Sequence, residues 1–204
     1  MRTLKEILHE SSLHHNRLCP RQILGARIGL AGMKVLGFDE PPAKKQLLAI
    51  TETDGCFVDG IVAATGCTVG HRTLRVEDYG KVASTFINTK TGFAVRVVPV
   101  LDVRQKALTY VMDESRHYFA QMQAYQIMPD EKLLTIQEVF LNTPIEQIVS
   151  KPSVRVNCDV CGEEIVNGRE IRQDGLNLCV PCVGDGYFQL VQADAVHVRQ
   201  IVSP

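Results

Sequence analysis

Residues 158–182 read CDVCGEEIVNGREIRQDGLNLCVPC, and this stretch decides how the C-terminal end of the chain folds. It contains two Cys-x-x-Cys pairs, Cys158 with Cys161 and Cys179 with Cys182, separated by seventeen residues. Four thiolates in two short hooks are the ligands that a tetrahedral structural zinc site requires. Because such a site leaves no open position for a substrate, the expected Zn²⁺ is structural. Iron is the competing metal, since Cys-x-x-Cys pairs bind both.

The residues around the four cysteines predict a treble-clef zinc-binding domain. Residues 158–162 have the pattern of a zinc knuckle, and residues 164–171 and 177–178 that of a hairpin. A closing helix is expected over residues 182–200, and its first turn is expected to supply the last two ligands. Knuckle, hairpin and helix together make a treble clef.

Breaker residues upstream of this region mark a domain boundary. Asn142-Thr143-Pro144 and Ser150-Lys151-Pro152 flank a short segment between the last expected strand and the first cysteine pair. The expected organisation is therefore a core domain over residues 1–152 followed by the treble-clef domain over residues 153–204.

The charge distribution argues against a nucleic-acid partner. The formal net charge of the chain is −1. Residues 155–204 contain four Lys and Arg against seven Asp and Glu, a net charge of −3 before any metal and thiolates are added. Neutralisation of phosphates by basic side chains supplies most non-specific affinity for nucleic acid, and this region lacks that basic surface.

Composition and terminal sequence predict a cytoplasmic protein without a membrane partner. The chain is 45% hydrophobic and 22% charged, which is ordinary for a globular protein. No apolar run approaches the roughly 20 residues that span a bilayer. Residues 1–10 lack the apolar core of a signal peptide. In the cytoplasm, paired cysteines favour metal binding over structural disulfides.

The first 152 residues mix helical and strand patterns without strict alternation, which predicts an α+β core domain with helices packed on a mixed or antiparallel sheet. Expected helices span residues 4–14, 21–36, 56–64 and 113–126, and expected strands span residues 46–53, 74–77, 83–88, 93–98 and 135–141. Thr3 and Glu6 have the spacing of a capping box at the start of the first helix.

The second expected helix contains Gly25, Gly29 and Gly32. Each glycine costs about 1 kcal/mol in a helix interior relative to alanine. Three of them therefore indicate close backbone packing, against a sheet or a second protomer.

The remaining cysteines, Cys19, Cys56 and Cys67, each lie at an expected helix terminus or in a polar turn. Cys19 precedes Pro20, a residue favoured at the first helical position, and a helix N-terminus stabilises a thiolate. Loops on a rigid scaffold often carry chemistry. On spacing alone, however, three unrelated buried cysteines that pack as small apolar residues are the favoured interpretation.

Two longer motifs change that balance. The first is HNRLCP at residues 15–20 with LGAR at 24–27, and the second is TDGCFVDGI at residues 53–61 with TGCTVG at 65–70. Together they resemble the FmdE family of formylmethanofuran dehydrogenase proteins. The segments DYGK at 78–81 and VRV at 95–97 add to the resemblance, which runs in order over most of residues 10–150. Members of this family often carry a cysteine-rich zinc module at the C-terminus.

The resemblance implies a compact α+β core that forms a homodimer and contains a polar, metal-capable pocket. It assigns His15, Cys19, Cys56, Asp59 and Cys67 to that pocket, where a second transition metal is expected. The chain departs from the family pattern at Asn16, Arg17 and Arg21, and the loss of a histidine there removes one candidate ligand. His71 stands where a lysine is common, and it is a candidate replacement ligand.

Three functional hypotheses remain open. The leading one is a metal-binding protein that is accessory to a metalloenzyme, with partner metalloenzyme subunits, or that handles a metal or cofactor. The second is an enzyme in which the Cys19 thiolate is the nucleophile and His15 the base. The third is a zinc-finger interaction module with an inert core pocket. Arg96, in an apolar strand, is interpreted as solvent-facing, with a position at the pocket as the alternative.

Overall fold

The computed structural model describes residues 2–13, 17–43, 45–149 and 153–189. The chain divides into two compact units, Met1–Glu146 and Gln147–Pro204, and each is described by itself below. The first unit contains a five-stranded sheet covered by helices, and the second contains short strands around four cysteines. The expected α+β fold, with a mixed sheet and a small C-terminal β region that carries the cysteines, is confirmed. Within the described ranges, no helix is long and apolar enough to cross a membrane.

The sheet of the first unit has the strand order β2-β1-β3-β4-β5. Its strands are β1 (Leu47–Thr51), β2 (Leu74–Val76), β3 (Ser84–Asn88), β4 (Ala94–Pro99) and β5 (Leu134–Glu138). Only the β1–β2 pair is parallel, because α3 (Cys56–Thr65) crosses over between these strands. The other neighbours pair antiparallel, as the hairpin between β3 and β4 requires.

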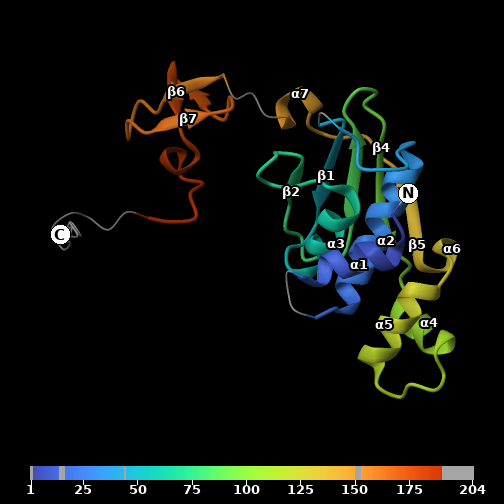
Figure 1. Cartoon of the computed structure of the whole chain (residues 1–204). Coiled ribbons are helices and arrows are strands. Elements are labelled where there is room, and N and C mark those ends of the chain that lie inside the picture. Colours follow the sequence, from blue (N-terminus) through green and yellow to red (C-terminus); the bar gives the residue numbers. More distant parts are fainter. Residues whose placement is uncertain (1, 14–16, 44, 150–152, 190–204) are drawn as a thin grey trace, which may run out of the picture. The chain divides into compact units, whose positions relative to one another are not determined.

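In Figure 1, the helices α1 (Leu4–Leu13), α2 (Pro20–Val35) and α3 lie in front of the sheet. The helices α4 (Val103–Tyr110) and α5 (His117–Ile127) lie beyond its lower end in that view, and the short α6 (Asp130–Leu133) leads into β5. The central helix is α2, which contacts β3, β4 and the helices α1, α3 and α5. Most of its residues are buried, on every side of the helix. The helix α7 (Ile145–Ile148) follows at the junction of the two units.

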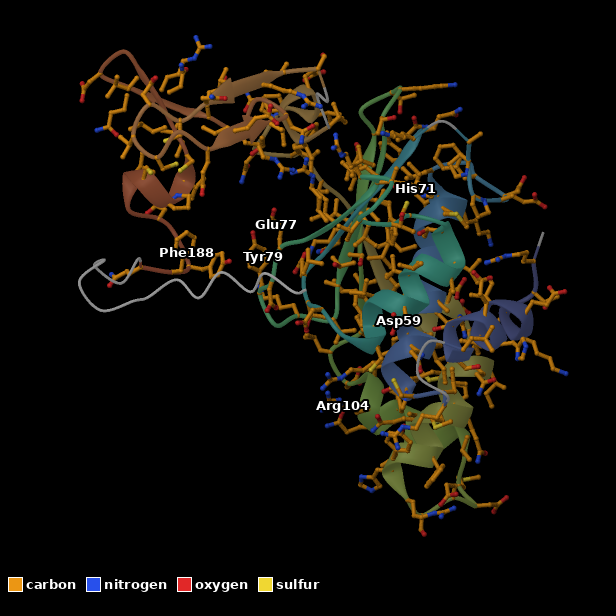
Figure 2. All side chains as sticks on the ribbon, turned by 60° about the vertical axis from the view of Figure 1, so that its left-hand side comes forward. Asp59, His71, Glu77, Tyr79, Arg104 and Phe188 are labelled. Atoms are coloured by element: carbon orange, nitrogen blue, oxygen red, sulfur yellow. The ribbon has the colours of Figure 1, made fainter. Side chains whose placement is uncertain are left out.

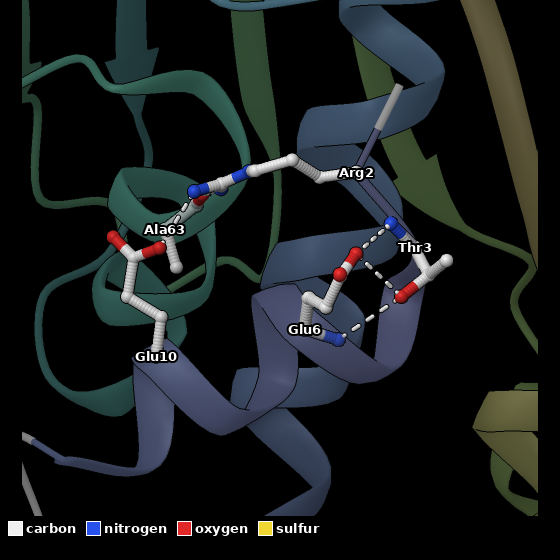
Figure 3. Close-up of polar contacts among 5 residues, drawn as sticks. All are labelled: Arg2, Thr3, Glu6, Glu10 and Ala63. Atoms are coloured by element: carbon white, nitrogen blue, oxygen red, sulfur yellow. Dashed lines mark hydrogen bonds and ion pairs between the residues drawn. The ribbon is translucent and has the colours of Figure 1, made fainter.

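The helix α1 starts at the expected capping box, shown in Figure 3. The backbone N–H of Thr3 donates to Glu6 Oε2 at 2.7 Å, and the N–H of Glu6 donates to Thr3 Oγ1 at 3.3 Å. The backbone N–H and the hydroxyl of Thr3, which both donate to the Glu6 carboxylate, lower the pKa of that carboxyl. Arg2 pairs with Glu10 at 2.6 Å and donates to the carbonyl of Ala63 in α3, which attaches α1 to its neighbour.

The glycines of α2 allow close contact with α3 and with the sheet. A Cβ atom at Gly25 would lie 2.1 Å from the carbonyl oxygen of Phe57, and one at Gly60 would lie 2.1 Å from that of Gln22. A Cβ atom at Gly32 would meet the ring of Phe86 in β3 at 2.1 Å. The expected close backbone packing is thus confirmed, with α3 and the sheet as the neighbours.

A buried arginine fixes the end of α5 against α2. Arg27 donates to the carbonyls of Tyr125 and Met128, both at 2.7 Å, and to Asp130 Oδ1 at 2.6 Å. The last carbonyls of a helix have no partner inside it, and Arg27 satisfies them here.

Some expected boundaries were wrong. The helix expected over residues 113–126 begins only at His117, because Glu114 accepts bonds from the backbone N–H and the guanidinium of Arg116, each at 2.9 Å, in a preceding turn. This pairing lowers the pKa of Glu114 to about 2. The helices α4 and α6 were not expected, since neither has a strong apolar period.

Arg96 does not extend freely into solvent as expected, because it pairs with Glu52 just after β1. Its Nε and Nη2 atoms lie 2.5 and 2.7 Å from the two carboxylate oxygens, and Glu52 is 7% exposed. The pair raises the pKa of Arg96. Arg96 lies opposite Thr85 in β3, so this ion pair bridges three adjacent strands.

Replacing Arg96 with methionine is expected to lower the free energy of unfolding by about 2 kcal/mol, because it leaves the buried Glu52 carboxylate without its partner. The partial exposure of Arg96 keeps the loss below that of a fully buried pair. Urea unfolding checks this, with exposed Arg104→Met as the matched control. The double variant Glu52→Gln/Arg96→Met should regain part of the loss, and equal stability of wild type and Arg96→Met would contradict the assignment.

The second unit contains two small hairpins. One pairs β6 (Arg155–Asn157) with β7 (Glu164–Val166), and the other pairs β8 (Ile171–Gln173) with β9 (Leu176–Leu178). The single hairpin expected from residues 164–171 and 177–178 was therefore wrong, because Gly162 and Gly175 each adopt positive φ and turn the chain twice. Where the closing helix was expected, the described residues up to Gln189 form the 3₁₀ turn η1 (Val180–Val183). The rest of the expected helix, residues 190–200, lies outside the described residues.

Candidate metal centre

The four cysteines of the second unit converge on one point. Cys158, Cys161, Cys179 and Cys182 offer sulfur atoms that all lie within 4.8 Å of one another. The Sγ atoms of Cys161 and Cys179 are 3.8 Å apart. A tetrahedral zinc ion with Zn–S bonds of about 2.3 Å places its sulfurs about 3.8 Å apart. The cluster therefore fits a four-coordinate metal ion.

Backbone hydrogen bonds position the two cysteine hooks. The N–H of Cys158 donates to the Glu163 carbonyl, and the N–H of Gly162 donates back to the Cys158 carbonyl, both at 2.9 Å. Gly162 has a φ of +77°, which a residue with a side chain rarely adopts. The second hook begins where β9 ends, and the N–H of Cys182 donates to the Cys179 carbonyl at 3.0 Å. The knuckle and the 3₁₀ turn η1 thus present their sulfurs to each other.

The electrostatics of the cluster favour a bound cation. Backbone N–H groups of Cys161 and Cys179 lower the pKa of Cys158 to about 6. Its neighbour Cys182 is affected in the opposite direction, since the thiol of Cys179 and burial raise its pKa to about 12. Four thiolates repel one another at this distance, and a divalent cation in the centre removes that repulsion. A metal ion is what allows all four groups to be deprotonated together.

One side of the cluster is accessible. Cys158 is buried, whereas the other three cysteines border a surface hollow of about 360 Å³. A metal ion held by the cluster would be accessible to a chelator from this side.

In the first unit, Cys19 is the N-cap of α2. Its Sγ accepts the N–H of Gln22 at 3.4 Å, and its own N–H donates to Gln22 Oε1 at 2.8 Å. The Gln22 side chain is fully buried and also donates to the Ser11 carbonyl at 3.0 Å. Gln22 was not singled out from the sequence, although Cys-x-x-Gln is the capping-box spacing with cysteine in place of serine or threonine.

The candidate residues of the first unit fall into two groups. Cys19 and Cys56 interact at the N-termini of α2 and α3, and Asp59 lies in the first turn of α3. Cys67 follows the opposite end of α3, where burial raises the pKa of its thiol. His71 borders a hollow of about 250 Å³ together with Cys67, and Figure 2 shows it away from Asp59. His15 lies outside the described residues.

The comparison with protein families decides the relationship. The family described as "FmdE, Molybdenum formylmethanofuran dehydrogenase operon" matches residues 14–150 of this chain. The chain belongs to the FmdE family. The expectation from the motifs is thereby confirmed, and all candidate residues of the first unit lie within the FmdE match. The four-cysteine cluster lies C-terminal to it.

A solved structure supports the FmdE fold. A tungsten formylmethanofuran dehydrogenase FmdE-like protein from Syntrophus aciditrophicus superposes with a TM-score of 0.59 at 21% sequence identity. The match covers 92% of this chain and 96% of that chain.

A curated relative of this FmdE protein is a probable S-adenosyl-L-methionine-binding protein from Archaeoglobus fulgidus. The two are 29% identical over an alignment of 206 positions, and the match covers 90% of this chain and 54% of the relative. The chain thus spans about half the length of that protein.

Proposed function

We propose that this FmdE-family protein is a metal-binding accessory protein whose C-terminal unit contains one structural zinc ion. The separation of 3.8 Å between the sulfurs of Cys161 and Cys179 supports this best, because it is the spacing of a tetrahedral thiolate site. Zinc is preferred over iron because two Cys-x-x-Cys hooks on small hairpins are the usual form of a structural zinc site.

A second metal site in the FmdE domain belongs to the same proposal. Cys19 and Cys56 supply two sulfur atoms at one end of α3, and Asp59, in the first turn of that helix, and His15 are the candidates for completing the site. Cys67 and His71 form a separate candidate group at the other end. Sulfur and imidazole ligands suit a transition metal.

The family description, which refers to a formylmethanofuran dehydrogenase operon, supports the accessory role in this proposal. We place the protein in the cytoplasm as a homodimer that assists a partner metalloenzyme or handles its metal or cofactor. Size-exclusion chromatography with light scattering tests the dimer.

Elemental analysis of the purified chain is expected to give one zinc per chain from the C-terminal cluster and a second metal from the FmdE domain. Cys179→Ser should remove the zinc and leave the second metal, whereas Cys56→Ser should do the reverse. The two variants control for each other, because each removes one thiol from a different unit. Detection of iron instead of zinc would show that the C-terminal cluster binds iron. A single metal that is unaffected by Cys56→Ser would rule out the second metal site in the FmdE domain.

A second candidate function comes from the Archaeoglobus fulgidus relative, whose similarity extends over 90% of this chain. If this chain binds S-adenosyl-L-methionine, calorimetric titration of the full-length protein should show saturable binding. His71→Ala tests whether the hollow beside Cys67 contributes. No heat at millimolar ligand would reject this candidate.

A further inference from the structure

The helices α2 and α3 run parallel, so their N-termini lie at the same end of the helix pair. A Cβ atom at Gly25 would meet Phe57 and Gly60, and one at Gly29, a turn later in α2, would meet Ile61, Ala64 and Thr65, a turn later in α3. The residue numbers of the two helices therefore rise together along the contact. Because Gly25 lies against Phe57 and Gly60 lies against Gln22, the first turns of the two helices are in contact, and the positions that precede Gln22 and Phe57 lie at the same end of the pair.

Those preceding positions carry two cysteines. Cys19 is the N-cap of α2, and Cys56 is the first residue of α3. The two side chains interact, and both the burial of Cys56 and the Cys19 thiol raise the pKa of Cys56. Each cysteine is only partly buried, so a small reagent can reach the pair. Among the described residues, no His, Cys, Asp or Glu joins them in a group of three ligand atoms.

We propose that Cys19 and Cys56 are a redox-active dithiol that closes into a reversible disulfide between the N-termini of α2 and α3. The oxidant is a low-molecular-weight disulfide such as oxidised glutathione. Oxidation does not depend on the metal proposed above, and a disulfide would exclude metal from these two sulfurs. The pair then makes metal binding in the FmdE domain dependent on thiol redox state.

The exchange proceeds in two steps. The Cys19 thiolate attacks one sulfur of oxidised glutathione, and the S–S bond breaks to release one glutathione thiolate. Cys56 then loses its proton and attacks the Cys19 sulfur of the mixed disulfide, which releases the second glutathione thiolate. Two cysteine thiols are oxidised, one glutathione disulfide is reduced to two thiols, and the two protons pass to the glutathione thiolates.

The structure favours Cys19 as the first nucleophile. Its Sγ accepts the N–H of Gln22 at 3.4 Å, and the first turn of the sixteen-residue α2 supplies positive partial charge. The guanidinium of Arg21 adds a full positive charge near the pair. Cys56 follows Gly55 without a side-chain cap bond of its own and is free to act as the resolving thiol.

Peptide mapping of the full-length, zinc-loaded chain tests this dithiol. The protein is equilibrated in glutathione buffers, alkylated and digested with trypsin, which places Cys19 in residues 18–21 and Cys56 in residues 46–72. The second peptide also contains Cys67, so the digest uses Cys67→Ala as background. We expect residues 18–21 linked to residues 46–72 in oxidising buffer, reversal by dithiothreitol, and loss of the linkage in Cys19→Ser and Cys56→Ser.

A dilution series separates the disulfide from a simple glutathione adduct. Diluting total glutathione tenfold at a fixed ratio of thiol to disulfide should raise the ratio of linked to reduced pair about tenfold, while an adduct on one cysteine stays constant. Absence of the linked peptide, or only an adduct on Cys19, would overturn the dithiol. Metal analysis of the wild-type chain in parallel keeps the two proposals distinct, since a linked peptide without a second metal supports only the dithiol, and a second metal without a linked peptide supports only the metal site.

Discussion

Removing the metal from the C-terminal unit is expected to unfold that unit while the FmdE domain stays folded. Among its described residues, the core around the cysteines holds three buried side chains, Cys158, Ile165 and Leu178, and one of these is a proposed metal ligand. A unit of this size cannot bury enough apolar surface to fold alone. Structural zinc contributes on the order of 10–16 kcal/mol in small zinc modules, so its loss exceeds what the remaining contacts provide.

Limited trypsin digestion measures this directly, because Arg155, Arg169 and Arg172 all lie in the second unit. Chelation or Cys179→Ser should expose these sites within minutes, and added Zn²⁺ should protect the chelated wild type again. Val180→Ala, which changes the exposed residue between two ligands, is the matched control and should remain protected. Protection that persists without metal would show that the hairpins fold unaided.

The same unit should also lose its metal in acid. The backbone N–H groups of Cys161 and Cys179 lower the pKa of Cys158 from 9.0 to about 6, so protons displace the metal from this sulfur as the pH falls through about 6. The metal needs deprotonated ligands, so its affinity falls in the same direction. Protection from trypsin should therefore decrease steeply below about pH 6.

Gly60→Ala is expected to lower the stability of the FmdE domain by at least about 3 kcal/mol. The added methyl group would lie 2.1 Å from the Gln22 carbonyl oxygen and 2.6 Å from the Ala26 nitrogen, which are backbone atoms that cannot rotate away. The helices must separate, and that disrupts the packing of α2. The gain of about 1 kcal/mol in helix propensity does not offset this loss.

Thermal unfolding should show the effect of Gly60→Ala as a decrease in Tm of about 10 °C. Gly70→Ala is the control, because a Cβ atom there meets nothing within 4 Å and the backbone is not left-handed. In the same experiment, Gly60→Ala should reduce formation of the Cys19–Cys56 linkage. An unchanged Tm would mean that the two helices do not approach as closely as the structure indicates.

Local patterns predicted much of this fold. The capping box at Thr3 and the breaker at Gly37 bounded α1 and α2 closely, and the turn at residues 89–92 gave the hairpin between β3 and β4. The pairing of Arg96 with Glu52 was missed, because side-chain alternation along one strand does not reveal a carboxylate that follows another strand.

The candidate site residues also fall into those that local sequence patterns predict and those that only the packing of the fold brings together. The four C-terminal cysteines were found from spacing, since short hooks determine local geometry by themselves. Cys19 and Cys56 are brought together by the parallel packing of two helices, which no spacing encodes. Cys67 was grouped with them on motif resemblance, yet α3 separates it from Cys56 by ten residues, or about 15 Å of helix.

The crossing of α2 and α3 also makes a prediction about other sequences. At Gly25 and Gly60 the obstacle to a larger residue is the partner helix's backbone, which no substitution on the opposite helix can shrink. A compensating pair of mutations is therefore not available at these two positions. Relatives that bring a cysteine at position 19 against one at position 56 should carry glycine at both crossing points, and relatives that have lost either glycine should have lost the cysteine pairing as well.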